Sequence, residues 1–145
     1  MIIDTQALFS DDQAVTATAV SSNIIDLGAT GTVVGGSSAL GRDIGKGTPI
    51  ELLIQWTAAA TAAGAATGTV DLETDDNSSF SSATTLATTG AIGKATLVAG
   101  HQMKIHYMPR GAERYIRLNY TVATGPLTAG AVTAGIVAGV QTNDV

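Results

Sequence analysis

The chain has no cysteine, so neither a disulfide framework nor a thiolate metal site can form. Charged residues make up only 13% of the 145 residues and aromatic residues only 4%, although 45% are apolar. The core must therefore be thin and aliphatic, built from Ala, Val, Ile and Leu. A chain of this length buries roughly 68–70% of its unfolded surface, so a single domain needs no covalent or metal reinforcement.

Basic charge and long apolar runs are scarce as well. The net charge is −5, and a general nucleic-acid binder needs clustered Lys and Arg to displace counterions from phosphates. The longest apolar run, residues 129–140, contains Thr133 and is far shorter than the roughly 20 residues of a helical membrane span. No basic region precedes an apolar segment near Met1, so no signal peptide is expected. We expect neither nucleic acid nor a membrane as a partner.

The clearest pattern in the chain is period-two alternation across residues 101–141. It predicts three antiparallel strands at 101–108, 114–122 and 132–140, separated by turns that contain Pro and Gly. In the first of them, Met103, Ile105 and Tyr107 should share one face. In the second, the inward residues should be Ile116, Leu118, Tyr120 and Val122.

Shorter alternating runs precede this region. They predict strands at 23–27, 50–56, 69–75, 84–88 and 94–99, with residues 57–67 forming a loop or a loose strand edge. On the strand at 50–56 the inward residues should be Ile50, Leu52, Ile54 and Trp56, with Trp56 as a core anchor. No helical stretch is convincing. About eight or nine strands, spaced every 8–15 residues, indicate an all-β fold, an antiparallel β-sandwich or barrel.

Two segments lie apart from the strand pattern. Residues 1–22 read as an extended N-terminal arm ahead of one β-sandwich domain at 23–145. This N-terminal segment either packs on its own sandwich or reaches a neighbouring subunit. Its large apolar side chains are Ile2, Ile3, Leu8 and Phe9. The second segment is a Gly-rich loop at 28–48 with seven glycines, in which a short pairing is expected at 32–34. Loops this long are usually functional or disordered.

No catalytic or cofactor motif is found. Residues 41–48 lack the glycine spacing of a P-loop, and Gly47 follows Lys46 where Ser or Thr should stand. The only histidines, His101 and His106, lie outside any hydrolase motif and should face opposite ways on a strand. We therefore expect no enzymatic activity, no cofactor and no metal.

Charged residues suggest two surface features. Asp71, Glu73 and Asp75 should form an acidic strand face, which we expect to be solvated, with a partner-facing patch or a calcium site as alternatives. Four of the seven basic residues fall between 104 and 117: Lys104, Arg110, Arg114 and Arg117. This local positive patch serves either solubility or docking to an acidic surface. The candidate partner-contact residues are Ile2, Ile3, Leu8, Phe9, Arg110, Arg114 and Arg117.

Several segments together resemble a bacteriophage capsid cement (decoration) protein of the Bordetella-phage type. They are Met-Ile-Ile-Asp at 1–4, Asn-Ile-Ile-Asp-Leu-Gly at 23–28, Ala-Ala-Gly-Ala-Ala-Thr at 62–67, Thr-Asp-Asp-Asn-Ser-Ser-Phe-Ser-Ser at 74–82, Leu-Val-Ala-Gly at 97–100, Pro-Arg-Gly at 109–111 and Arg-Tyr-Ile-Arg-Leu-Asn-Tyr at 114–120. The Gly-rich stretch at 29–41 departs from the family in being longer.

The resemblance implies a jelly-roll sandwich on the outer surface of the virion capsid. It would bridge neighbouring major capsid protein subunits as a homodimer, with no catalysis and no cofactor. An alternative is a glycan-binding or host-attachment module of the virion, because jelly rolls also serve as lectins. Sugar sites usually need stacking aromatics, and here Trp56, Tyr107, Tyr115 and Tyr120 are few and mostly predicted to face inward.

Overall fold

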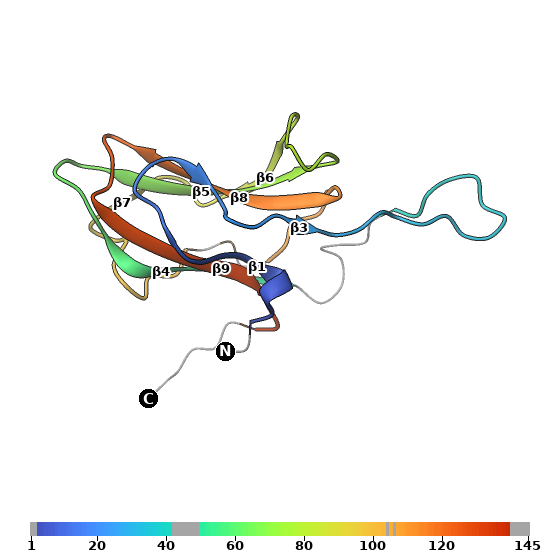
Figure 1. The fold of residues 1–145 in the computed structure, drawn as a ribbon, viewed down its shortest axis with the longest axis horizontal. Coiled ribbons are helices and arrows are strands. Elements are labelled where there is room, and N and C mark those ends of the chain that lie inside the picture. Colours follow the sequence, from blue (N-terminus) through green and yellow to red (C-terminus); the bar gives the residue numbers. More distant parts are fainter. Residues whose placement is uncertain (1–2, 42–49, 104, 106, 140–145) are drawn as a thin grey trace.

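The computed structural model describes residues 3–41, 50–103, 105 and 107–139, and within them the chain forms a two-layered antiparallel β-sandwich (Figure 1). The smaller sheet has the order β1-β9-β4, with β1 at Leu8–Ala14, β9 at Ala129–Val137 and β4 at Glu51–Thr61. The larger sheet has the order β2-β8-β5-β6, with β3 also on β8 and β7 also on β5. Its strands are β2 Ala19–Val20, β3 Ile25–Asp26, β5 Thr67–Asp75, β6 Thr84–Thr88, β7 Ile92–Gly93 and β8 Tyr115–Ala123. A 3₁₀ turn, η1 (Thr5–Ala7), precedes β1.

The strand connectivity is that of a jelly roll. Along the chain, β1 pairs with β9, β2 and β3 pair with β8, and β5 pairs with β6. The remaining partner of β4 is the segment 101–108, because Trp56 N donates to His101 O and Met103 N donates to Ile54 O. The first half of the chain thus pairs in reverse order with the second half, and this long ribbon rolls up into two sheets. The predicted all-β, jelly-roll-like sandwich is confirmed.

The regular strand predicted at 101–108 is not found in the described residues of that segment. Among the described residues of this segment only Gln102 forms a ladder bridge, with Gln55. Met103 and Ile105 are buried, but Tyr107 is 59% exposed, so the expected alternation fails. Gly100, with φ of 86°, bends the chain just before the segment. Lys104 and His106 lie outside the described residues.

The predicted strand at 94–99 is also wrong. Backbone hydrogen bonds from Thr96 to Gly93 and from Leu97 to Lys94 form turns there, although Leu97 itself is fully buried. An apolar residue in a turn can bury its side chain without belonging to a strand. Sequence periodicity does not distinguish such a turn from a short strand. The third strand of the C-terminal region begins at Ala129, three residues before the predicted start.

The core lies between the sheets and is mainly aliphatic, as predicted. Its largest fully buried side chains are Trp56, Tyr120 and Phe9, surrounded by residues such as Ile54 and Leu118. The Trp56 indole N–H donates to the Met103 sulfur at 3.1 Å. The Tyr120 hydroxyl lies 2.7 Å from Ser10 Oγ, and burial raises the pKa of Tyr120 to about 12. The polar group of each of these two side chains, the Trp56 N–H and the Tyr120 hydroxyl, therefore has a partner inside the core.

Two residues of the strand predicted at 50–56 differ from their predicted facing. Ile50 is 40% exposed, whereas Leu53, expected on the outer face, is only 3% exposed. Leu53 pairs across the sheet with Gly135, and Leu8 pairs with the same glycine from the other side. Because Gly135 has no side chain, Leu8 can pack closely over it: a Cβ at this position would lie 3.1 Å from Cδ2 of Leu8.

Candidate interaction surface

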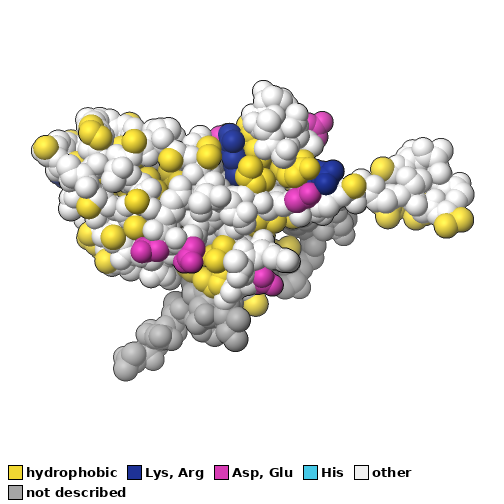
Figure 2. Space-filling model, viewed as in Figure 1, with side chains coloured by type: hydrophobic (Ala, Val, Ile, Leu, Met, Phe, Trp, Pro, Cys, Tyr) yellow, Lys and Arg dark blue, Asp and Glu magenta, His cyan; other side chains and the backbone are white. Residues whose placement is uncertain are grey.

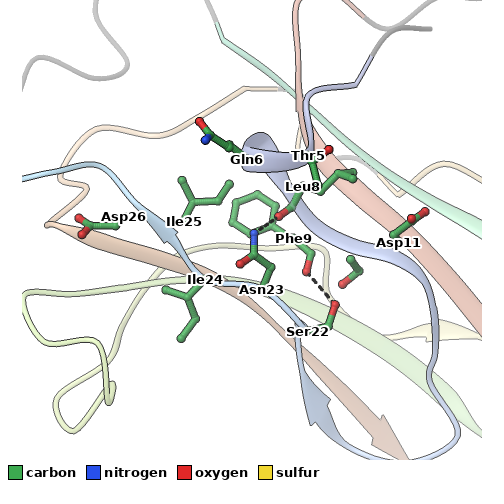
Figure 3. A pocket seen from close by; sticks show the side chains of 11 residues that line it. Thr5, Gln6, Leu8, Phe9, Asp11, Ser22, Asn23, Ile24, Ile25 and Asp26 are labelled. Atoms are coloured by element: carbon green, nitrogen blue, oxygen red, sulfur yellow. Dashed lines mark hydrogen bonds between the residues drawn. The ribbon is translucent and has the colours of Figure 1, made fainter.

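A groove opens at one side of the sandwich, between the β1 edge and residues 22–26 (Figure 3). Its volume is about 530 Å³, within the range of binding pockets in proteins. Phe9 and Ile25 are buried at its base, and Ile24 is 37% exposed. The lining residues are Thr5, Gln6, Leu8, Phe9, Ser10, Asp11, Ser22, Asn23, Ile24, Ile25 and Asp26.

The groove exists because its two walls belong to different sheets. Strand β1 is an edge of the smaller sheet, while β3 lies at an edge of the larger one. Asn23 joins the walls. Its backbone N–H donates to Phe9 O at 2.9 Å, and its side-chain amide, drawn in Figure 3, donates to Leu8 O at 2.7 Å. Seven of the eleven lining residues are polar, Asp11 and Asp26 among them, so the groove offers a ligand both apolar and polar surface.

A projecting hairpin, residues 28–41, begins where the groove ends. We call it the arm, as distinct from the N-terminal segment at residues 1–22. It extends away from the sandwich as the cyan ribbon of Figure 1. Thr32 pairs with Ala39, and every residue from 29 to 41 is exposed. The short pairing expected near 32–34 is therefore present, while residues 42–48 of the predicted Gly-rich loop lie outside the described residues.

The root of the arm is held by β8. Arg114 forms a two-pronged ion pair with Asp26, each N–O distance being 2.9 Å, and Leu27 N donates to Arg114 O. Gly28 N donates to Asp26 Oδ1 at 2.8 Å, with Gly28 at a φ of 78°. The hydrogen bond to Asp26 is the main cause that raises the pKa of Arg114. These contacts set the direction in which the arm leaves the sandwich.

Most of the described residues of the expected basic patch form ion pairs within the chain. Arg117 pairs with Glu73 at 2.8 Å and stacks over the Phe80 ring, 4.1 Å from its centroid. Arg114 pairs with Asp26, as described, and only Arg110 is exposed without an ion pair among the described residues. Figure 2 shows the basic side chains of this face next to acidic ones.

The N-terminal residues predicted to contact a partner differ in how far they are buried. Phe9 is fully buried in the core of its own sandwich, so it is not free to reach a neighbour. Leu8 is half-buried and lines the groove, and Ile3 is half-buried. Ile2 lies outside the described residues.

The expectation of a solvated acidic strand face is wrong for Glu73 and Asp75, which are 8% and 0% exposed. The loop after β5 folds over this face and carries Phe80 onto Arg117. Asp75 organises the loop: it accepts hydrogen bonds from Asn77 N at 2.9 Å and from Ser82 N at 2.8 Å. Burial acts to raise the pKa of Asp75, but the hydrogen bonds outweigh it and lower the pKa below the ordinary value of 3.8.

Asp75, Asp76 and Glu113 bring carboxylate oxygens within 4.8 Å of one another. Both oxygens of Asp75 already accept backbone hydrogen bonds, and the other two residues are exposed. The calcium alternative gains no support from this arrangement. His101 is half-buried, and its Nε2 has no hydrogen-bond partner among the described residues.

Replacing Asp75 with Asn should lower the melting temperature at pH 7, because an amide offers one acceptor oxygen to two backbone donors. The folded pKa of Asp75 lies below 3.8, so its stabilising effect is present above that pH and is lost as the pH falls further. The difference between the two proteins should therefore shrink below pH 3.8. Thermal unfolding followed by circular dichroism from neutral to acid pH tests this, with Asp71→Asn as the control. A difference that did not change with pH would contradict it.

Sequence reasoning missed the groove and the tip of the arm. The groove is formed by residues that are local in sequence but lie on two sheets, so no periodicity reveals it. The tip carried a usable signal: Val33 and Val34 are adjacent apolar residues inside a glycine-rich stretch. Such residues in a loop point either to burial or to a contact with another molecule.

Comparison with known proteins adds the last observation. No helix in the described residues is long and apolar enough to cross a membrane. No curated protein matches the chain. A family model described as Bbp16 matches residues 9–136, which include all the strands of both sheets except the first residue of β1 and the last residue of β9. This chain, a jelly-roll sandwich with a projecting arm, therefore belongs to the Bbp16 family of Bordetella phage proteins, which indicates a virion-associated protein.

Proposed function

We propose that this protein is a capsid cement protein that binds the outside of a tailed-phage head and clamps neighbouring major capsid subunits. The observation that carries the proposal is the arm: a hairpin without charged side chains, exposed from residue 29 to 41, whose root is held to β8 by the Asp26–Arg114 ion pair. Membership of a phage protein family supports the setting.

A cement protein works by contact rather than by chemistry, and the features of this chain suit that role. Its acidic net charge of −5 fits the outer surface of a head better than the surface that faces DNA. Many identical copies on one shell would each contribute a modest contact, and copies that span two subunits gain from effective concentration. In this proposal the protein has no catalytic role and needs no cofactor.

A glycan-binding module of the virion is the second candidate. Tyr107, 59% exposed, is the one observation that favours it, because an exposed ring can stack on a sugar. Trp56 and Tyr120 are buried in the core, and Tyr115 lies half-buried beside Arg114. A single exposed ring is a poor basis for a sugar site, so the cement role is preferred.

Co-sedimentation with heads of the phage that encodes the protein tests the proposal. We expect saturable binding at a fixed number of copies per capsid, and coated heads should withstand higher temperature before they release DNA. A glycan array should give no specific binding. Failure to bind heads, together with specific glycan binding, would favour the attachment module and reject the cement role.

A further inference from the structure

The groove beside β1 is bordered by extended chain on both sides. One wall is β1 with the η1 turn that precedes it, and the other is the segment 22–26, which includes β3. Pockets of about 300–1,000 Å³ hold drug-sized ligands, and the volume of this groove is about 530 Å³. A short stretch of extended peptide is a ligand of suitable size and shape.

The backbone of β1 is already bonded where it borders the groove. Leu8 O accepts from the Asn23 side-chain amide at 2.7 Å, and Phe9 O accepts from Asn23 N at 2.9 Å. Further along the strand, the side chain of Gln13 accepts from Ser22 N at 2.8 Å. A peptide therefore cannot join β1 here as an added strand, and the groove must recognise it through side chains.

The apolar part of the lining lies at the centre of the groove. Figure 3 shows Phe9 and Ile25 between Asp11 on one side and Asp26 on the other. Phe9 and Ile25 are buried, whereas Ile24 is 37% exposed. An aliphatic side chain that entered the groove would cover the exposed surface of Ile24 and remove it from water, which favours binding.

The charge of the described lining is negative, because it contains two aspartates and no Lys, Arg or His. Asp26 is neutralised by its two-pronged ion pair with Arg114. Asp11 is exposed, and no hydrogen bond or ion pair joins its carboxylate to another described residue. The groove thus presents an unpaired anion on a chain of net charge −5, which attracts a cationic group and repels an anionic one.

Two neutral polar side chains complete the lining near η1. Thr5 and Gln6 are exposed, and neither side chain forms a hydrogen bond with another described residue. The amide of Gln6 offers both a donor and an acceptor, which are the two groups that a peptide bond needs as partners.

We propose that this groove binds an extended segment of a different protein, in which a side chain the size of Leu, Ile or Val neighbours a Lys or Arg. The aliphatic side chain packs on Ile24 above the buried Phe9 and Ile25, the basic group pairs with Asp11, and Gln6 bonds the peptide backbone. This goes beyond the cement role, because it assigns the groove a ligand of defined chemistry whether or not the protein sits on a head.

Titration with blocked dipeptides, followed by heteronuclear NMR of the isotope-labelled protein, tests the site without any heads. The probe is acetyl-Leu-Arg-amide, used also in the reverse order, and it should cause saturable shifts at residues 5–11 and 22–26. Acetyl-Leu-citrulline-amide has nearly the same shape without the charge and should bind about 2–5-fold more weakly, as expected from one exposed ion pair. Acetyl-Ala-Arg-amide and acetyl-Leu-Glu-amide should bind more weakly than acetyl-Leu-Arg-amide.

Substitutions connect the preference to particular side chains. Asp11→Asn should abolish the preference for arginine over citrulline, whereas Ile24→Ala should weaken binding and keep that preference. Asp12→Asn is the matched control: it makes the same change of charge one residue away, at a carboxylate that accepts from Thr57 and does not line the groove. It should leave the preference intact.

Three results would overturn the proposal. One is the absence of saturable shifts at the groove with both orders of the dipeptide. Another is a preference for arginine that Asp11→Asn does not change. The third is equal binding of acetyl-Leu-Glu-amide and acetyl-Leu-Arg-amide. Because none of these measurements involves a capsid, they leave the test of the cement role separate.

Discussion

Replacing Trp56 with alanine should lower the free energy of unfolding by about 3–5 kcal/mol, the largest single loss that we expect from this chain. Trp56 is 1% exposed and is the only tryptophan in a core that has few large side chains. Its removal leaves a cavity between the sheets and deprives the Met103 sulfur of its N–H donor. The aliphatic neighbours are too short to close such a gap.

Urea denaturation followed by far-UV circular dichroism measures this loss. Tyr107→Ala is the matched control, since it also removes a large ring but from a position that is 59% exposed. Its effect should stay within about 0.5 kcal/mol, as for most surface substitutions. Similar losses for the two variants would mean that Trp56 does not anchor the core.

Replacing Gly130 with alanine should cost about 2–4 kcal/mol, from two sources that act together. The new Cβ would lie 2.6 Å from Cζ3 of Trp56, closer than real Cβ contacts allow. In addition, Gly130 has φ of 150°, a conformation that residues with a side chain rarely adopt. The rigid indole ring cannot move aside without disturbing β4, so the core must expand or the backbone must shift.

Gly68→Ala is the informative comparison. Its Cβ would lie 2.9 Å from the Cδ1 methyl of Leu97, a flexible side-chain end, and 3.5 Å from Cζ2 of Trp56. Gly68 has no positive φ, so only the crowding remains, and its cost should be smaller than that of Gly130→Ala.

A double-mutant cycle with Trp56→Phe separates the two sources at Gly130. The smaller ring should relieve the clash but not the backbone strain, so the cost of Gly130→Ala should fall by about 1–2 kcal/mol in the Trp56→Phe background. An unchanged cost would assign the whole effect to the backbone.

The predicted elements that the structure confirms are those with long alternation or a single dominant residue. The strand predicted at 114–122 is found as β8 at Tyr115–Ala123. The prediction succeeds because four inward apolar residues at every second position allow only one facing of the strand. Trp56 was recognised as the core anchor for a similar reason: nothing else in the chain of that size could fill the centre of the sandwich.

The errors occur where side chains are buried by contacts that alternation does not describe. Glu73 and Asp75 follow an outward pattern, yet both are buried. Asp75 accepts a hydrogen bond from Ser82 in the loop after β5, whereas Glu73 is paired with Arg117 of β8, over which Phe80 of that loop lies. Arg114 and Arg117, expected to form a free patch, find carboxylates 88 and 44 residues away in the chain. Pairing across such distances depends on which strands become neighbours.

Composition and periodicity alone determined that this protein is an all-β sandwich with an aliphatic core and a glycine-rich excursion after residue 27, because burial of alternate side chains is a local property of each strand. Only the tertiary structure decided that the excursion is a projecting arm with an apolar tip, that its root is held by an arginine from β8, and that a groove opens beside it. Those features arise where separate sheets meet, and the free energy of such contacts depends on three-dimensional proximity that no stretch of sequence encodes by itself.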